Sequence, residues 1–354
     1  MERLGVVMDG DQDNPDEAMG VLNPASCRDR AGHLILFPRI VAAGNFSRVG
    51  RAAVRFAGGV PVGVERQGYA LEPTEGFERN SATAGVEDPR VTFIAALDCY
   101  VMTYTAFGPL GPRIALAVSA DALTWRRIGP VKFAYMPEFG MDFDLYPNKD
   151  AILFPEPVRD PHGRPALALI HRPDFNVAWW SNPPFAVPPR GITEPRPSMW
   201  LSYVPLDAVL EDESRLLLWG DHHLLAVPEQ PWEESKIGGG TPPVLTAHGW
   251  LTIYHGVGRA PRPNTPGQTV PIYRAGALIL DREDPRIVRY RSPEPILSPE
   301  TDLEREGIVN NVVFPTAIDY SSDSEEYGWG DVYYGMADAR IGVARFRVPA
   351  TLPQ

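Results

Sequence analysis

Residues 91–125 read VTFIAALDCYVMTYTAFGPLGPRIALAVSADALTW and contain three short runs of β-branched and aromatic residues separated by turn formers. The runs at 91–96, 100–105 and 113–119 predict consecutive strands. After the third run, Asp121 is expected to accept hydrogen bonds from turn amides, and Trp125 is expected to pack between sheets. The stretch therefore predicts β-hairpins whose turns are fixed by side chains.

Similar runs recur along the whole chain, whereas helical periodicity is nearly absent. The predicted strands are 33–37, 52–56, 91–96, 100–105, 113–119, 151–154, 166–171, 198–204, 215–219, 250–257, 273–280, 310–318, 332–336 and 341–348. The best helix candidate, 206–213, is too short to support a βαβ architecture. Many short strands favour an all-β sandwich, barrel or propeller, and a chain of 354 residues fits a propeller best.

The turn at residues 119–125 supports this choice. Its sequence, SADALTW, is similar to the Asp box of sialidase-type propellers, although it is one residue short and lacks the glycine. No change in composition marks a domain boundary, so we expect one domain over 1–354, with residues 1–30 as a candidate N-terminal extension. The 38 prolines and 32 glycines are consistent with a fold rich in turns.

The charge of the chain limits its partners. A formal net charge of −12 argues against nucleic acid or an anionic membrane as the main partner, and an anionic substrate would need a local basic pocket. No targeting segment and no apolar run of about 18 residues is found, so we expect a cytoplasmic protein. A homo-oligomer is left open.

Two cysteines, Cys27 and Cys99, are too few for a disulfide framework or a zinc site. Phosphate-binding glycine motifs and a Gly-x-Ser-x-Gly elbow are also missing, which argues against nucleotide binding and against a serine hydrolase. We therefore predict no metal and no cofactor.

The acidic pair Glu87-Asp88, followed by Pro89 and Arg90, stands at the start of a predicted strand. Neighbouring residues of an extended chain point to opposite sides, so only one of the two carboxylates can face a central pocket. A carboxylate at the mouth of a sheet suits acid chemistry on a sugar. The alternative is that Asp88 only caps a turn before the proline.

Four basic residues lie at strand ends or beside a glycine-rich turn, where loops from separate blades converge: Lys149, Arg172, Lys236 and His255. An oxyanion can be held among them if they meet. Taken singly, each has another explanation, because lysines are usually solvated, an arginine is often ion-paired, and a strand histidine is often satisfied locally.

Taken together, these motifs resemble glycoside hydrolase family 130, the mannoside phosphorylases and mannosidases built on a five-bladed β-propeller. The resemblance runs from about residue 45 to 345. It rests on EDPR at 87–90, MTYTA at 102–106, KDAILFPE at 149–156, HRP at 171–173, KIGGGTPP at 236–243, GWL at 249–251, YHGV at 254–257, YRAGA at 273–277, NNVVFP at 310–315 and YYGMAD at 333–338.

The resemblance implies a role for each candidate residue. Asp88 becomes the general acid of an inverting reaction and acts through the mannosyl 3-hydroxyl as a proton relay. Phosphate is then surrounded by Lys149, Arg172, Lys236 and His255, and the mannosyl unit by Asn45, Arg66, Tyr104 and Asp338. Lys149 stands where some members carry an arginine, which keeps the charge and loses the bidentate geometry.

The implied enzyme is a glycosyltransferase-type glycoside phosphorylase. It cleaves a β-mannoside, such as β-mannosyl-glucose or a β-manno-oligosaccharide, with inorganic phosphate as co-substrate and gives α-mannose 1-phosphate. The retained basic cluster favours this reaction over an inverting β-mannosidase, which would use water, and over a non-catalytic glycan-binding propeller. Nearby cations are expected to lower the pKa of Asp88 unless burial or bound phosphate offsets them.

Overall fold

The computed structural model describes residues 1–80, 83, 85–176, 187–261, 267–321 and 328–353. Strands in four sheets make up most of the ordered elements, so the prediction of an all-β fold is confirmed. The two α-helices are short, α1 (Leu206–Glu211) and α2 (Asp302–Arg305). The 3-10 turns are η1 (Pro15–Glu17), η2 (Gly76–Glu78), η3 (Ala95–Leu97), η4 (Phe143–Leu145), η5 (Glu213–Leu217) and η6 (Pro231–Glu233).

The largest sheet has the order β2-β3-β4-β6-β7-β8-β9, with β5 paired to β4. Its strands are β2 (Val21–Arg28), β3 (Leu34–Ala42), β4 (Phe46–Ala57), β5 (Val60–Leu71), β6 (Gly85–Ile94), β7 (Cys99–Gly108), β8 (Gly111–Ser119) and β9 (Arg126–Pro130). A single parallel pair, Ser47 with Gly85, joins β4 to β6, whereas all other pairings in the sheet are antiparallel. The sheet therefore consists of two antiparallel four-stranded units joined by one backbone pair.

Gly85 is needed at that contact. Its φ is +148°, and a Cβ there would lie 2.4 Å from the carbonyl oxygen of Ser47. A larger residue would push the two units apart, because backbone atoms cannot give way at such a distance.

Two more sheets follow in chain order. One has the order β10-β15-β14-β13-β11, with β12 paired to β13, and the other has the order β16-β18-β19-β20, with β17 paired to β18. Their strands are β10 (Lys132–Phe133), β11 (Asn148–Leu153), β12 (Val158–Arg159), β13 (Pro165–Pro173), β14 (Met199–Pro205), β15 (Leu218–Ala226), β16 (Lys236–Gly238), β17 (Val244–Thr246), β18 (Gly249–Pro261), β19 (Thr269–Leu280) and β20 (Val288–Arg291).

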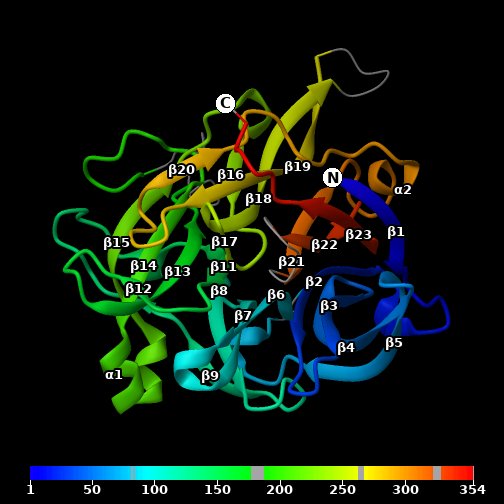
Figure 1. Cartoon of the computed structure of the whole chain (residues 1–354), viewed down its shortest axis with the longest axis horizontal. Helices are drawn as coiled ribbons and strands as arrows, with labels where there is room; N and C mark the ends of the chain where they lie inside the picture. Colours follow the sequence, from blue (N-terminus) through cyan, green and yellow to red (C-terminus); the bar gives the residue numbers. More distant parts are fainter. Residues whose placement is uncertain (81–82, 84, 177–186, 262–266, 322–327, 354) are drawn as a thin grey trace.

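The last sheet joins the two ends of the chain. Its order is β1-β23-β22-β21, and its strands are β1 (Glu2–Met8), β21 (Val313–Ser321), β22 (Trp329–Met336) and β23 (Arg340–Arg347). The N-terminal strand β1 pairs antiparallel with β23, as in Glu2 with Arg345. Figure 1 shows the strand units following one another around a centre in chain order, with blue β1 beside red β23. The arrangement is propeller-like, and the backbone hydrogen bonds between β1 and β23 link the first strand to the last sheet.

One strand in each of three units carries the same distortion. The pairing register shifts after Leu22 in β2, after Glu87 in β6 and after Lys149 in β11. Each shift contains a residue with left-handed backbone, namely Asn23, Asp88 and Asp150, with φ of 42°, 45° and 59°. Asn and Asp tolerate this conformation better than most residues, and β-bulges re-aim side chains beside active sites.

The turn predicted at residues 119–125 is confirmed in detail. Oδ1 of Asp121 accepts hydrogen bonds from the amides of Leu123 and Thr124, each at 2.8 Å. The ring of Trp125 packs edge-on against Phe37 of β3, with 5.5 Å between the ring centroids. The tryptophan therefore contacts a strand of a different unit, as the sequence pattern indicates.

The strand predicted at 215–219 is mostly wrong. Residues Glu213–Leu217 form η5, and β15 begins only at Leu218. The reason is local, because the side chain of Asp212 accepts a hydrogen bond from the amide of Ser214 and so starts a 3-10 turn. The helix predicted over 206–213 is confirmed as α1.

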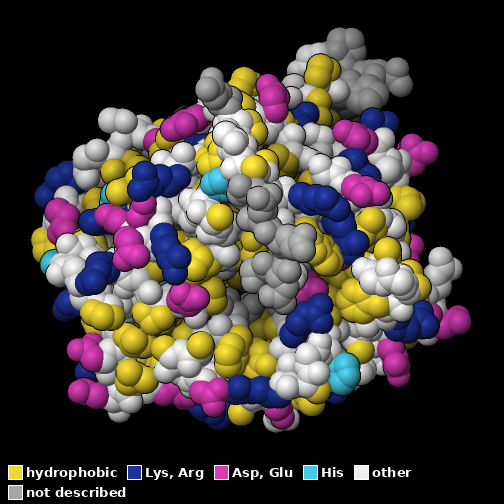
Figure 2. All heavy atoms as spheres, in the orientation of Figure 1, with side chains coloured by type: hydrophobic (Ala, Val, Ile, Leu, Met, Phe, Trp, Pro, Cys, Tyr) yellow, Lys and Arg dark blue, Asp and Glu magenta, His cyan; other side chains and the backbone are white. Residues whose placement is uncertain are grey.

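Apolar clusters pack between neighbouring units, and the largest one contains Trp200, Trp219 and Phe143. On the face drawn in Figure 2, acidic and basic side chains are interspersed with apolar ones. In the described part of the chain, no helix is long and apolar enough to cross a membrane.

Candidate active site

A cavity lies where several strand units meet. Its lining residues are Asn23, Arg39, Asp88, Lys149, Asp150, Arg172, Lys236, His255, Tyr273, Val309, Val312, Phe314 and Asp338. Four cationic side chains and three carboxylates are among them, in a chain whose net charge is −12. Cations therefore outnumber carboxylates in the lining of this cavity, whereas carboxylates outnumber cations in the chain as a whole.

Six of the nine predicted site residues line this cavity: Asp88, Lys149, Arg172, Lys236, His255 and Asp338. They come from β6, β11, β13, β16, β18 and the turn between β22 and β23. Residues separated by 250 positions in the sequence are therefore brought to one place by the order of the strands.

The other three predicted residues are not among the residues that line the cavity. Asn45 is exposed at the turn between β3 and β4 and accepts a hydrogen bond from Arg39 at 3.2 Å. Arg66 forms an ion pair with Glu17 at 2.7 Å. Tyr104 is buried and donates its hydroxyl hydrogen to Glu78 at 2.7 Å. Their roles in sugar binding stay predictions.

One side of the cavity presents cationic nitrogens that no acceptor among the described residues satisfies. Lys149 lies opposite Arg172 in the register of β11 and β13, which puts both side chains on the same face. Within the described residues, no hydrogen bond or ion pair satisfies Nζ of Lys149, Nζ of Lys236 or the terminal nitrogens of Arg172. Burial, with Arg172 nearby, lowers the pKa of Lys236 to about 8. Such unpaired cations are expected to bind an anion.

Asp150 orients the arginine. Its Oδ2 accepts a hydrogen bond from Nε of Arg172 at 2.6 Å, and the carboxylate is 2 % exposed. Nη2 of Arg90 lies 3.9 Å from Oδ1. Burial alone would raise the pKa of Asp150, but the positive charges of Arg172 and Arg90 outweigh it and hold the pKa far below its usual range. Asp150 is therefore an anion whose bond to Nε leaves the terminal nitrogens of Arg172 free.

His255 is held from both sides. Its Nδ1 donates a hydrogen bond to the carbonyl oxygen of Gly239 at 3.2 Å, and its ring packs against Phe314 with 4.5 Å between centroids. A Cβ on Gly238 would lie 2.5 Å from Cε1 of the ring, so a glycine is required beside it. Burial, Arg172 and Lys236 lower the pKa of His255 to about 3, although Asp150 opposes the shift.

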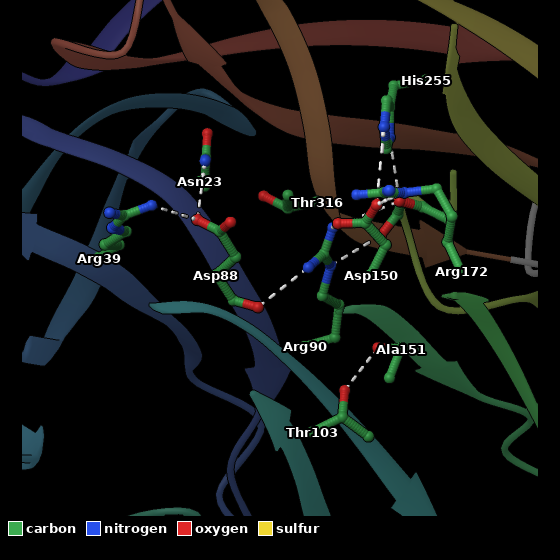
Figure 3. Close-up of polar contacts among 12 residues, drawn as sticks. Asn23, Arg39, Asp88, Arg90, Thr103, Asp150, Ala151, Arg172, His255 and Thr316 are labelled. Carbon is green, nitrogen blue, oxygen red and sulfur yellow. Dashed lines mark hydrogen bonds and ion pairs between the residues drawn. The ribbon is translucent and has the colours of Figure 1, made fainter. Parts of the chain in front are cut away.

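The opposite side of the cavity holds Asp88 (Figure 3). Oδ1 of Asp88 accepts hydrogen bonds from Nδ2 of Asn23 at 2.8 Å and from Arg39 at 3.2 Å. Arg39 also bonds Glu87 at 2.8 Å, and Arg90 donates to the backbone oxygen of Asp88 at 3.0 Å. In this view Arg90 lies between Asp88 and the group formed by Asp150, Arg172 and His255.

Two carboxyl groups in the cavity have opposite pKa shifts. Burial raises the pKa of Asp88, but Arg39, Lys149 and Arg90 outweigh it, so the pKa is lowered. Burial raises the pKa of Asp338 to about 6, and the negative charges of Asp88 and Glu87 add to the increase. Around pH 6 a proton therefore resides on Asp338 in preference to Asp88.

Arg39, Asn23, Asp150 and Tyr273 line the cavity but were not predicted as site residues. Asp150 directly follows Lys149, and its position in a bulge is invisible in a pattern of alternating residues. Arg39 and Asn23 lie in a region where strand patterns are interrupted by proline, at Pro38 and Pro24. Among the described residues, no group of three or more His, Cys, Asp or Glu side chains is placed to hold a metal ion.

Known proteins resemble this chain over most of its length. The sequence model of the beta-1,4-mannooligosaccharide phosphorylase family, glycoside hydrolase family 130, matches residues 2–352. A 1,2-beta-oligomannan phosphorylase from Thermoanaerobacter is 32% identical over 79% of this chain and 78% of that protein. A beta-1,2-mannobiose phosphorylase from Listeria innocua is 28% identical over 77% of this chain, which spans 60% of that relative.

A solved structure shares the fold. It is a beta-1,2-mannobiose phosphorylase from Listeria innocua in complex with beta-1,2-mannobiose, with a TM-score of 0.66 and 22% identity. The alignment covers 93% of this chain and 90% of that chain. At this identity the likeness supports the fold alone.

Proposed function

The chain belongs to glycoside hydrolase family 130, and we propose that it cleaves a β-mannoside with inorganic phosphate to give α-mannose 1-phosphate. The observation that carries the proposal is one cavity lined by a buried carboxyl group, Asp88, and by cationic nitrogens that have no hydrogen-bond or ion-pair partner among the described residues. These nitrogens are Nζ of Lys149, Nζ of Lys236 and the terminal nitrogens of Arg172. Phosphate needs several positive groups in a partly desolvated pocket, and water as a nucleophile needs none.

In the proposed reaction, a phosphate oxygen attacks the anomeric carbon of the mannosyl unit from the face opposite the leaving oxygen. The new carbon–oxygen bond forms as the glycosidic bond breaks. The leaving oxygen takes the proton of the mannosyl 3-hydroxyl, which is replaced by the proton of Asp88. The mannosyl phosphate first formed still carries the hydrogen of hydrogenphosphate, and its transfer to Asp88 restores the carboxyl group. Hydrogenphosphate and the mannoside thus become a mannosyl phosphate dianion and a free sugar, with no net change of the enzyme.

Asp88 must carry a proton when the bond breaks, although the cations around it lower its pKa. A bound phosphate dianion cancels part of the field of Lys149 and Arg172 and raises the pKa of a nearby carboxyl group. Phosphate therefore acts both as nucleophile and as the charge that lets Asp88 hold its proton.

We also propose that the strand units are the blades of a five-bladed propeller. The single pair between Ser47 and Gly85 divides the eight-stranded sheet into two units, and each of the other three sheets supplies one more. The cavity where these units meet is then the mouth of the central channel.

The proposed substrate is a β-manno-oligosaccharide, with β-1,2-mannobiose as the first to test, because the two relatives named above act on β-1,2-linked substrates by their names. The product is a charged sugar phosphate, and a cell keeps such a product only when it forms inside the membrane. We therefore propose that the protein is located in the cytoplasm. β-1,4-Mannobiose and β-mannosyl-glucose are the other candidate substrates.

The test is the phosphate dependence of cleavage and the identity of the product. Each candidate disaccharide is incubated with and without phosphate, and we expect turnover only with phosphate, with α-mannose 1-phosphate as product. Equal turnover without phosphate would instead identify an inverting β-mannosidase. Binding of a mannoside by a wild-type protein that turns over none would identify a glycan-binding propeller.

A further inference from the structure

The anion side of the cavity contains hydrogen-bond acceptors as well as donors. Beside Lys149, Arg172 and Lys236 lie the carboxylate of Asp150 and the imidazole of His255. A pocket built only from donors accepts any oxyanion of suitable size and charge. An acceptor in such a pocket repels an oxygen that carries no hydrogen.

The geometry fixes which nitrogen of His255 is the acceptor. A carbonyl oxygen can only accept, so the bond of 3.2 Å to Gly239 requires the hydrogen on Nδ1. The surrounding charges of Arg172, Lys236 and Arg90 disfavour a second proton on the ring, in line with its lowered pKa. Nε2 therefore keeps its lone pair.

No donor in the described residues satisfies that lone pair. Oδ2 of Asp150 lies 3.7 Å from Nε2, and this oxygen already accepts from Nε of Arg172 at 2.6 Å. An ionised carboxylate has no hydrogen to give, so two acceptor atoms face each other without a hydrogen between them. His255 is 1 % exposed, which makes an unmet acceptor there costly.

We propose that this site selects an oxyanion that carries a hydrogen, and that Nε2 of His255 accepts the hydrogen bond from its P–O–H group. The remaining oxygens then take the hydrogens of Arg172, Lys149 and Lys236. This inference rests on the proposed function and specifies which form of the co-substrate binds. Phosphate and arsenate keep at least one hydrogen at neutral pH, whereas sulfate, of the same shape, keeps none.

The experiment is titration calorimetry of the wild-type chain with phosphate, arsenate and sulfate at neutral pH and constant ionic strength. We expect phosphate and arsenate to bind alike and sulfate to bind about 10- to 100-fold more weakly, since it loses one hydrogen bond and leaves a buried acceptor unmet. A sulfate affinity within about twofold of that of phosphate would overturn the inference.

His255→Gln supplies the matched change. The glutamine amide has both a donor and an acceptor, so it can serve either anion, and the ratio of the two affinities is expected to fall towards one. His33→Gln is the control, because His33 is exposed and, among the described residues, pairs with Asp29 alone, so the ratio should stay as in the wild type. An unchanged ratio in a folded His255→Gln variant would contradict the role of His255. If this variant does not fold, the wild-type titration decides alone.

The outcomes separate this inference from the proposed function. Turnover that requires phosphate, together with equal affinity for sulfate, refutes only the selectivity. No turnover with phosphate and no binding of either anion refutes the proposed function itself.

Discussion

Arg172→Lys tests how the cavity holds its anion. Arg172 uses Nε for Asp150, at 2.6 Å, and leaves its terminal nitrogens for the cavity. A lysine has one nitrogen and can satisfy Asp150 or the anion, but not both with good geometry. The loss of one charge-assisted hydrogen bond is worth about 1.5–3 kcal/mol, which corresponds to about a 10- to 100-fold rise in the KM for phosphate.

Initial rates of mannobiose cleavage at varied phosphate measure this effect. We expect kcat to fall much less than the phosphate affinity, because Arg172 contacts neither Asp88 nor its partners. Arg126→Lys is the matched control, since Arg126 forms an exposed pair with Glu213. A KM for phosphate within about twofold of the wild type, in a folded Arg172→Lys variant, would refute the assignment of Arg172 to the anion.

Further outcomes follow from the same geometry. The KM for phosphate should rise as the pH passes above about 8, because Lys236 loses its charge there. Lys236→Arg should move that rise to higher pH. A KM for phosphate that does not change across pH 8 in the wild type contradicts the role of Lys236. The melting temperature should fall between about pH 7 and about pH 5. Buried His171 and His222 have lowered pKa values and stay neutral in the folded chain, so below about pH 6.5 only the unfolded chain binds protons at these residues. A melting temperature that stays unchanged over this range contradicts the argument. Gly238→Ala should destabilise the fold by about 1–3 kcal/mol and weaken phosphate binding, because the added Cβ would lie 2.5 Å from Oδ2 of Asp150. Gly76→Ala is the control: Gly76 has open space around it, so neither the stability nor phosphate binding should change.

The acid dependence has a physical origin in one buried chain of hydrogen bonds. Asn148 contacts Nδ1 of His171, whose Nε2 bonds Ser202, and the same hydroxyl meets His222 at 2.8 Å. Nε2 of His222 donates to the carbonyl oxygen of Ala134. His255, with its own lowered pKa, adds to the loss of stability in acid, whereas Asp338, with its raised pKa, opposes it with one proton.

The sequence predicts the strands well where apolar residues run unbroken. The runs at 100–105 and 113–119 coincide with β7 and β8, because alternation and turn residues agree there. Strand β2 was missed because Asn23-Pro24 interrupts it, and the bulge at this point is what turns Asn23 towards Asp88. The residues that break the local pattern are therefore the ones that build the site.

The sequence predicts four basic residues of the cavity but not the side chains that orient the site. Lys149, Arg172, Lys236 and His255 line one cavity, but only the sheet order brings them there. Asp150 and Arg39 act through bonds to other side chains, at 2.6 Å to Arg172 and 3.2 Å to Asp88, and no pattern of spacing contains those distances. The sequence also predicts Trp179-Trp180 as an aromatic platform for a sugar ring, and these two residues lie outside the described residues.

A crystal structure of the protein grown with phosphate tests the central claim most directly. We predict tetrahedral density in contact with Arg172, Lys149, Lys236 and His255, on the side of the cavity that faces Asp88. A cavity without such density at saturating phosphate, or a phosphate bound elsewhere in the protein, would contradict the account.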